Sequence, residues 1–344
     1  MNNKFKNKFF KNKTILITGG TGSFGYAAIK ILLKNFSLKK IIIFSRDEFK
    51  QSEMKKFFED KFKKESYKLR FFIGDVRDYD RLSYASKDVD YVVHAAAMKQ
   101  VDTSEYNPME CIKTNILGAE NVVRVSIQNK VNNVIALSTD KAVNPINLYG
   151  ATKLASDKIF ISANNIVGSQ NTVFSVVRYG NVIGSRGSVE PLFRGLSKRK
   201  AKFFPITDKD MTRFWLKLDA GVDFVIESFI RMKGGEIFIP KIPSVRIIDL
   251  AKSINPKMKH KIIGIRPGEK LHELLYNVDD SNIVIEFKDH YVIPPSIIFN
   301  KKKNYFINHV KEVGVKGKKN LEFSSNNNKW FLKVNELKAM YHKN

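Results

Sequence analysis

Short apolar runs alternate with longer stretches of mixed polarity along the first 140 residues of the chain. The apolar runs occupy residues 14–18, 40–45, 69–74, 90–96 and 132–138. Runs of this length, without polar alternation, are typical of strands in a sheet that is covered on both faces. The stretches between them predict helices at residues 24–33, 47–64, 78–86 and 108–129. Strands and helices in regular succession form parallel βαβ units, so we expect an α/β fold with a doubly wound parallel sheet.

The pattern changes after about residue 180, where glycine, proline and arginine become more frequent and the alternation loosens. We expect a nucleotide-binding domain at residues 12–180, which receives later strands from the C-terminal half, and a smaller mixed substrate-binding lobe at residues 181–300. Residues 1–11 and 301–344 are expected to be basic terminal segments. No apolar stretch reaches transmembrane or signal-peptide length, which predicts a cytoplasmic protein without a membrane partner.

The chain carries 60 Lys and Arg against 34 Asp and Glu, a formal net charge of +26. Residues 1–13 hold five lysines and no acid, and residues 301–344 hold eleven lysines and three glutamates, so half of the excess lies at the two ends. No recognised nucleic-acid motif accompanies this charge. We therefore expect a basic surface that suits anionic substrates and no nucleic-acid partner.

The first predicted strand is followed directly by GGTGSFG, residues 19–25, which opens the first predicted helix. Glycines at every third position allow a tight turn and the close approach of a pyrophosphate, whose charge the N–H groups of the helix N-terminus stabilise. In this strand–turn–helix context the pattern predicts a Rossmann-type dinucleotide-binding domain. The loop residues expected to contact the cofactor are Gly19, Thr21, Gly22, Ser23, Phe24 and Gly25.

The end of the second predicted strand favours NADP over NAD. Ser45 and Arg46 stand where an acidic residue would bind the ribose 2′-hydroxyl of NAD, and they suit a 2′-phosphate, to which Lys50 adds charge. Asp47 either points at the ribose, which would suit NAD, or caps the next helix. Asp75 either lies at the adenine edge of the cofactor or is a turn aspartate. The further residues expected at the cofactor are Val76 and Ala96.

Tyr149 and Lys153 form a Y-x-x-x-K pattern, which places both side chains on one face of a helix. An ammonium beside a phenol favours the phenolate, so we expect Lys153 to lower the pKa of Tyr149. Such a tyrosine can take the proton of a sugar hydroxyl while hydride leaves the same carbon. Thr139, at the end of the preceding strand, would orient that hydroxyl.

Several motifs carry a resemblance to a known family. GGTGSFG, HAAA (94–97), TN (114–115), STDK (138–141) and YGATK (149–153) together resemble the extended short-chain dehydrogenase/reductases. FSRDEFKQ, GDVRD, HAAAMKQV, YGNVIGSRGS, MTRFW and GIRPGEKLHE are similar to one branch, the inverting UDP-N-acetylglucosamine 4,6-dehydratases (5-epimerases) of pseudaminic acid biosynthesis. The resemblance covers roughly residues 12–300, and FSSNNNKWF near the end also fits.

The resemblance implies conversion of UDP-N-acetylglucosamine to UDP-2-acetamido-2,6-dideoxy-β-L-arabino-hex-4-ulose, with a tightly bound, recycled NADP and a homo-oligomer, dimer or hexamer. Tyr149 would act in oxidation at C4, Lys141 at C5 and Asp140 at the C6 hydroxyl. Lys141 must be neutral to take a proton, so its pKa must fall below the usual value, by burial or by neighbouring positive charge. The alternative is that Asp140 caps a turn and Lys141 binds phosphate.

The substrate side is expected to hold the pyrophosphate with arginine side chains. The residues that the resemblance and the residue chemistry assign to the substrate are Lys99, Asn181, Val182, Arg186, Arg213, Arg266 and Glu269. No metal site is expected, and His94 is expected to pack at a strand end rather than to catalyse.

Two other functions compete with this interpretation. A C4 epimerase or a retaining 4,6-dehydratase would share the fold and the Tyr149–Lys153 pair, but the pairing of Asp140 with Lys141 argues against both. A redox-sensing or nucleic-acid-binding protein that keeps NADP only as a ligand would not need the complete set of Tyr149, Lys153, Asp140 and Lys141.

Overall fold

The computed structural model of the chain describes residues 3–185, 187–297 and 303–341; Arg186, which the sequence assigns to the substrate, lies outside them. The apolar runs form a parallel sheet in the order β3-β2-β1-β4-β5-β6-β10, which confirms the predicted α/β class. Its strands are β1 (Thr14–Thr18), β2 (Lys40–Ser45), β3 (Leu69–Ile73), β4 (Tyr91–His94), β5 (Asn133–Thr139), β6 (Val173–Tyr179) and β10 (Ile237–Pro240). Three short antiparallel strands extend the β10 edge to ten strands: β15 (His290–Ile293), β14 (Ile285–Glu286) and β16 (Val315–Lys316).

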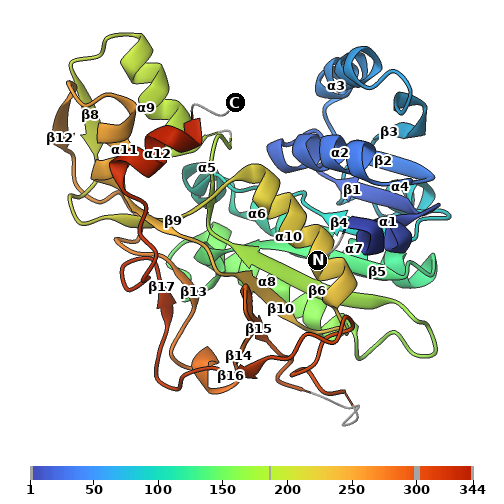
Figure 1. The fold of residues 1–344 in the computed structure, drawn as a ribbon. Coiled ribbons are helices and arrows are strands. Elements are labelled where there is room, and N and C mark those ends of the chain that lie inside the picture. Colours follow the sequence, from blue (N-terminus) through green and yellow to red (C-terminus); the bar gives the residue numbers. More distant parts are fainter. Residues whose placement is uncertain (1–2, 186, 298–302, 342–344) are drawn as a thin grey trace.

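Helices cover both faces of this sheet (Figure 1). On one face α2 (Ser23–Asn35) and α10 (Leu218–Arg231) lie side by side, and the N-terminal helix α1 (Asn3–Phe10) packs on α10. On the other face α7 (Gly118–Gln128) lies between α4 (Tyr79–Ala85) and α8 (Leu148–Ala163). The remaining helices of this part are α3 (Glu48–Lys61), α5 (Val101–Tyr106) and α6 (Pro108–Ile112), with short turns η1 (Ser66–Lys68), η2 (Lys113–Leu117), η3 (Asp140–Ala142) and η4 (Asp280–Asn282).

Side-chain caps set the starts of helices α3 and α8, as the sequence chemistry requires. Asp47 accepts a hydrogen bond from the backbone N–H of Lys50 at 2.9 Å, so α3 begins one residue later than predicted. Asn147 accepts from the N–H of Gly150 at 2.8 Å and starts α8. The predicted helix 108–129 is present but interrupted by the π-helical turn η2.

A second group of elements lies beside the carboxyl end of the sheet (Figure 1). It contains the sheet β11 (Ser244–Arg246), β9 (Thr212–Leu216) and β7 (Asn181–Val182), the pair β8 (Phe203–Ile206) and β12 (Lys259–Ile262), and helices α9 (Val189–Lys198), α11 (Ile247–Ile254) and α12 (Val334–Tyr341). Phe193, Phe204, Trp215 and Leu250 form its separate apolar core, to which Leu337 of α12 contributes. The lysine-rich C-terminal stretch therefore completes this lobe, and its strand β17 (Phe323–Ser324) pairs with β13 (Leu274–Tyr276).

Neither end of the chain is only a charged appendage. Phe10 of α1 is fully buried against Phe36, Tyr91 and Phe229 of the main core.

Within the described part of the chain, no helix combines the length and the apolar character that a membrane crossing requires.

Candidate active site

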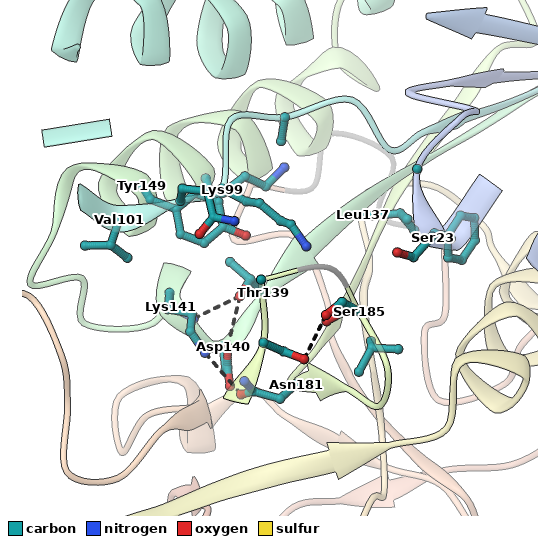
Figure 2. Close-up of a pocket in the computed structure, with 18 of the residues that line it drawn as sticks. Ser23, Lys99, Val101, Leu137, Thr139, Asp140, Lys141, Tyr149, Asn181 and Ser185 are labelled. Carbon is teal, nitrogen blue, oxygen red and sulfur yellow. Dashed lines mark hydrogen bonds and ion pairs between the residues drawn. The ribbon is translucent and has the colours of Figure 1, made fainter. Parts of the chain in front are cut away.

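A cavity of about 1160 Å³ lies where the carboxyl ends of the parallel strands meet the second lobe. This is the edge at which open α/β sheets bind their ligands. Its wall brings together the loop after β1, the ends of β2, β4 and β5, the start of α8, β7 and the segment before β13 (Figure 2). All described residues that the sequence assigned to cofactor or substrate line it, with the single exception of Gly25.

Glycines in the loop after β1 allow it to pack closely against neighbouring backbone. Gly19 has φ +65°, and a Cβ there would lie 2.8 Å from the Cα of Ala96. Gly25 does not face the cavity, because a Cβ there would lie 2.0 Å from the carbonyl oxygen of Gly20, so its role is the packing of helix on loop. Gly22 begins α2 without a side-chain cap, and the following residues line the cavity. The first N–H groups of α2 are therefore positioned for an anion.

The contacts of Asp47, which follows β2, correspond to the second of its two predicted roles, the cap of the next helix. Its carboxylate caps α3 and pairs with the Lys50 ammonium, so it is engaged within its own helix. The side chain of Arg46 is largely exposed, and its guanidinium lies 3.7 Å from the Asp75 carboxylate. Asp75 lines the cavity and accepts a hydrogen bond from the side chain of Arg77. Burial alone would raise the pKa of Asp75, but the hydrogen bonds and the charge of Arg77 lower it.

Tyr149 and Lys153 lie on the first two turns of α8. Figure 2 shows Tyr149 near Thr139, which ends β5. Lys153 is 3% exposed, and burial lowers its pKa. The expectation that Lys153 lowers the pKa of Tyr149 is wrong. Burial raises the pKa of Tyr149 to about 12, and a hydrogen bond with Thr139 and the charge of Lys141 oppose this only in part.

The close packing of α8 on η3 puts the tyrosine beside the Asp140–Lys141 pair. A Cβ at Gly150 would lie 2.2 Å from the carbonyl oxygen of Lys141, a distance that backbone atoms cannot accept. We therefore expect Gly150→Ala to lower the free energy of unfolding by about 3 kcal/mol, measured by urea denaturation. Gly195→Ala in α9 is the matched control, since no atom of the described residues lies within 4 Å of a Cβ added there, and it is expected to be neutral or to stabilise by up to about 1 kcal/mol. Equal effects of the two substitutions would contradict this account of the packing.

Asp140 and Lys141 form a hydrogen-bonded pair at the centre of the cavity. The Nζ atom of Lys141 lies 2.9 Å from Oδ1 of Asp140 and 3.3 Å from Oδ1 of Asn181. Thr139 donates to the same Asp140 oxygen at 2.9 Å. Asp140 is fully buried, and its other oxygen, Oδ2, has no hydrogen-bond partner among the residues that the structure describes. Burial, together with the charge of Glu273, raises the pKa of Asp140 although Lys141 opposes this.

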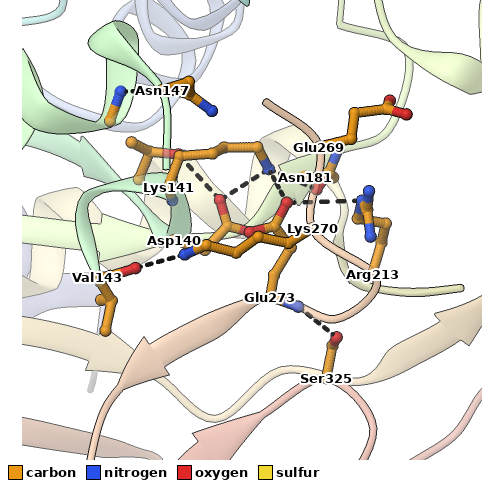
Figure 3. Close-up of polar contacts among 12 residues, drawn as sticks. Asp140, Lys141, Val143, Asn147, Asn181, Arg213, Glu269, Lys270, Glu273 and Ser325 are labelled. Atoms are coloured by element: carbon orange, nitrogen blue, oxygen red, sulfur yellow. Dashed lines mark hydrogen bonds and ion pairs between the residues drawn. The ribbon is translucent and has the colours of Figure 1, made fainter. Parts of the chain in front are cut away.

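The sequence analysis missed Glu273, whose Oε1 atom lies 3.2 Å from Nζ of Lys141 (Figure 3). The available signal was a carboxylate immediately before the apolar strand β13, within the motif GIRPGEKLHE. Glu273 also overturns the expectation that the pKa of Lys141 falls. Burial would lower that pKa, but the two carboxylates of Asp140 and Glu273 raise it above the usual value.

The residues assigned to the substrate lie on the lobe side of the cavity. Arg213 is buried, donates to the carbonyl oxygens of Thr212 and Leu271, and has its Nε atom 3.7 Å from Glu273. Arg266 forms a 2.6 Å ion pair with Glu269. The others in the cavity wall are Lys99, Asn181 and Val182. Lys270, which the sequence analysis did not select, also lines the cavity and donates to the carbonyl oxygen of Val143 at 2.5 Å.

His94 packs at the end of β4, as predicted. It is buried, its Nδ1 atom lies 2.8 Å from the hydroxyl of Thr18, and burial lowers its pKa to about 3. It is outside the cavity wall and is neutral near pH 7.

Comparison with known proteins adds to this geometry. The family model described as "Polysaccharide biosynthesis protein" matches residues 15–295. A relative from Campylobacter jejuni subsp. jejuni serotype O:2, named UDP-N-acetylglucosamine 4,6-dehydratase (inverting), is 58% identical over 329 residues, covering 95% of this chain and 97% of the relative. A protein from Rickettsia bellii, named UDP-glucose 4-epimerase, is 44% identical over 338 residues and 96% of each chain. The resemblance predicted from the motifs is confirmed.

Solved structures share the fold. The structure described as Pen from Bacillus thuringiensis has a TM-score of 0.85 at 36% identity and covers 98% of this chain and 100% of that chain. The dTDP-glucose 4,6-dehydratase DesIV from Streptomyces venezuelae, solved with NAD and TYD bound, has a TM-score of 0.66 at 20% identity, with 75% and 86% of the two chains covered. At 20% identity the second likeness shows the fold alone.

Proposed function

The chain belongs to the family of polysaccharide biosynthesis proteins, and from this premise we propose that it is an inverting UDP-N-acetylglucosamine 4,6-dehydratase. The product would be UDP-2-acetamido-2,6-dideoxy-β-L-arabino-hex-4-ulose. The observation that carries the proposal is the Asp140–Lys141 pair, joined at 2.9 Å in the same cavity wall as Tyr149 and Lys153. A plain epimerase needs only a base for C4, whereas loss of water requires a further base and acid.

The cavity fits a nicotinamide dinucleotide. The uncapped N-terminus of α2, whose first residues line the cavity, suits a pyrophosphate. Bound there, the cofactor would accept a hydride from C4, return it to C6, and bring a positive charge on its oxidised ring. Tyr149 is positioned to take the proton of the C4 hydroxyl, which Thr139 orients, and the charge of Lys141 opposes the rise that burial causes in the pKa of Tyr149.

We assign the elimination to Lys141 and Asp140. Lys141 as a neutral amine takes the C5 proton, which the C4 ketone has made acidic. Asp140 donates its proton to the C6 hydroxyl, which leaves as water. The Lys141 ammonium then returns a proton to C5 on the opposite face, which inverts that carbon. The raised pKa of Asp140 supports its assignment as the acid.

We propose NADP as the cofactor, since Asp47 is engaged in the cap of α3 and Arg46 is exposed at the end of β2. Arg46→Ala is expected to raise the Kd for NADP about tenfold with little change for NAD, because it removes a guanidinium from the 2′-phosphate. Isothermal titration with both dinucleotides measures this. Arg70→Ala is the control and should leave both affinities unchanged, because this exposed arginine of β3 donates to the backbone carbonyl oxygens of Tyr67 and Leu69. An unchanged NADP affinity in Arg46→Ala would contradict the preference.

The substrate pyrophosphate is assigned to Arg213 and Arg266 on the lobe side, with Lys99, Asn181, Val182 and Glu269 around the sugar and uridine. The resemblance of the motifs supports this assignment and two further ones. The reaction would be the first step of pseudaminic acid-type sugar biosynthesis, and the protein would act as a cytoplasmic homo-oligomer.

The proposal is tested by mass spectrometry of UDP-N-acetylglucosamine after incubation with the purified protein, without added cofactor. Loss of one water with no net oxidation is the expected result. The Rickettsia bellii relative named UDP-glucose 4-epimerase makes epimerisation the second candidate. A product of unchanged mass and altered C4 configuration would support the epimerase and reject the dehydratase.

A further inference from the structure

Glu273 lies against the amine that the elimination requires. Its Oε1 atom is 3.2 Å from Nζ of Lys141, and its side chain is only 3% exposed (Figure 3). We propose that Glu273 is a positioning residue for the elimination, whose carboxylate holds the Lys141 amine in place and stabilises the ammonium that forms when Lys141 takes the C5 proton. This inference rests on the proposed dehydration.

The surroundings of Glu273 and Asp140 shift the pKa values of the two carboxyl groups in opposite directions. Burial alone would raise the pKa of Glu273, but the charges of Lys141, Arg213 and Lys270 lower it. Asp140 has Lys141 as its cationic neighbour, is fully buried, and has a raised pKa. The pKa values of the two carboxyl groups therefore shift in opposite directions, and Glu273 is the one whose negative charge is favoured.

The C-terminal stretch fixes the main chain of Glu273. The backbone N–H of Glu273 donates to the hydroxyl of Ser325 at 2.9 Å, and its carbonyl oxygen accepts from the N–H of Ser325 at 2.8 Å. The same hydroxyl lies 2.7 Å from that of Thr212 on β9. Ser325 belongs to the motif FSSNNNKWF, which the proposed chemistry had not otherwise used. Residues more than fifty positions apart thus meet to aim one carboxylate at Lys141.

The proton balance gives Glu273 its role. Transfer of one proton from Nζ of Lys141 to Asp140, across their 2.9 Å hydrogen bond, gives a neutral amine and a neutral acid, the two states that the elimination needs. Lys141 then gains the C5 proton and Asp140 loses its proton to the departing water. The resulting ammonium lies between the two carboxylates of Asp140 and Glu273, which stabilise it.

The expected pH dependence follows from the groups that face Lys141. They are Asp140 of η3, Tyr149 of α8, Asn181 of β7, Arg213 of β9, and Lys270 and Glu273 before β13. When these groups together hold one further proton, Lys141 stays an ammonium and cannot act as the base. The elimination rate therefore rises with pH as that proton is lost. The negative charge of Glu273 favours that extra proton and therefore places the rising limb at higher pH.

The test compares Glu273→Gln with Glu273→Asp, using the complete protein and UDP-N-acetylglucosamine. For Glu273→Gln we expect the rising limb of kcat to move about 1–3 pH units lower and the plateau to fall about tenfold, because Lys141 becomes a weaker base. Reduction of the bound cofactor on mixing with substrate, which reports oxidation at C4, should keep its rate. Glu273→Asp retains the charge, so its limb should stay near that of the native protein although its plateau is lower.

The matched control is Glu286→Gln. Glu286 lies on β14, outside the cavity wall, and forms a 2.7 Å ion pair with Lys241. The pH profile of kcat should be unchanged in this variant. An unshifted limb in Glu273→Gln, or equal shifts in the Gln and Asp variants, would overturn the inference. If Glu273→Gln does not fold, Ser325→Ala is tested in its place. We then expect slower elimination with normal oxidation at C4. Unaltered elimination in Ser325→Ala would overturn the inference. A native protein that removes no water would instead reject the proposed function itself.

Discussion

Tyr149→Phe is expected to lower turnover of UDP-N-acetylglucosamine about 10³-fold, which is within the range for loss of a general base. The substitution removes the phenolic oxygen, and among the described residues no other tyrosine is both on α8 and in the cavity wall. Oxidation at C4 is the first chemical step, so neither reduced cofactor nor dehydrated product should form. The ring and its packing remain, so the fold and the affinity for the cofactor should be retained. Stopped-flow absorbance of the nicotinamide and product analysis measure both steps.

The control for Tyr149→Phe is Tyr106→Phe, at the exposed end of α5, where the side chain is 87% exposed. It should show native kinetics. Tyr149→Phe with turnover within tenfold of the native protein would exclude Tyr149 as the C4 base.

Asp140→Asn is expected to lower formation of the dehydrated product at least about 10²-fold, while leaving oxidation at C4 intact. The amide matches the carboxyl in shape but does not supply the proton that the C6 hydroxyl needs to leave. Since Tyr149 and Lys153 are unchanged, mixing with substrate should reduce the bound cofactor and stop there. Accumulated reduced cofactor, without loss of water, is therefore the signature to look for by absorbance and mass spectrometry.

Asp60→Asn, at an exposed carboxylate near the end of α3, is the control for this substitution and should behave as the native protein. Two results would remove Asp140 from the acid role: normal dehydration by Asp140→Asn, or loss of C4 oxidation together with dehydration in a folded variant.

The local part of this site could be predicted from the sequence. The strand–turn–helix signal around Gly19 and Gly22 and the spacing of Tyr149 and Lys153 depend on neighbouring residues, and the structure brings all four to one cavity. The helix caps are equally local, and Asp47 illustrates that an aspartate after a strand can be engaged by its own helix.

The protonation states could not be predicted in this way, because they depend on contacts between distant segments. Lys141 was expected to have a lowered pKa from burial, but Glu273, more than 130 positions later, joins Asp140 in raising it. Burial likewise outweighs the neighbouring charges at Tyr149. The position of Glu273 depends in turn on Ser325, and the sequence pattern offers no rule that pairs these residues.

The measurement that tests the central claim most directly is NMR of the product formed from UDP-N-acetylglucosamine by the purified protein in D₂O. The account predicts a 4-keto-6-deoxy sugar with deuterium at C5 and the L-arabino configuration, because Lys141 removes the C5 proton and returns a solvent-derived one to the opposite face. A D-xylo product would contradict the inverting role of Lys141. An intact C6 hydroxyl would contradict dehydration altogether.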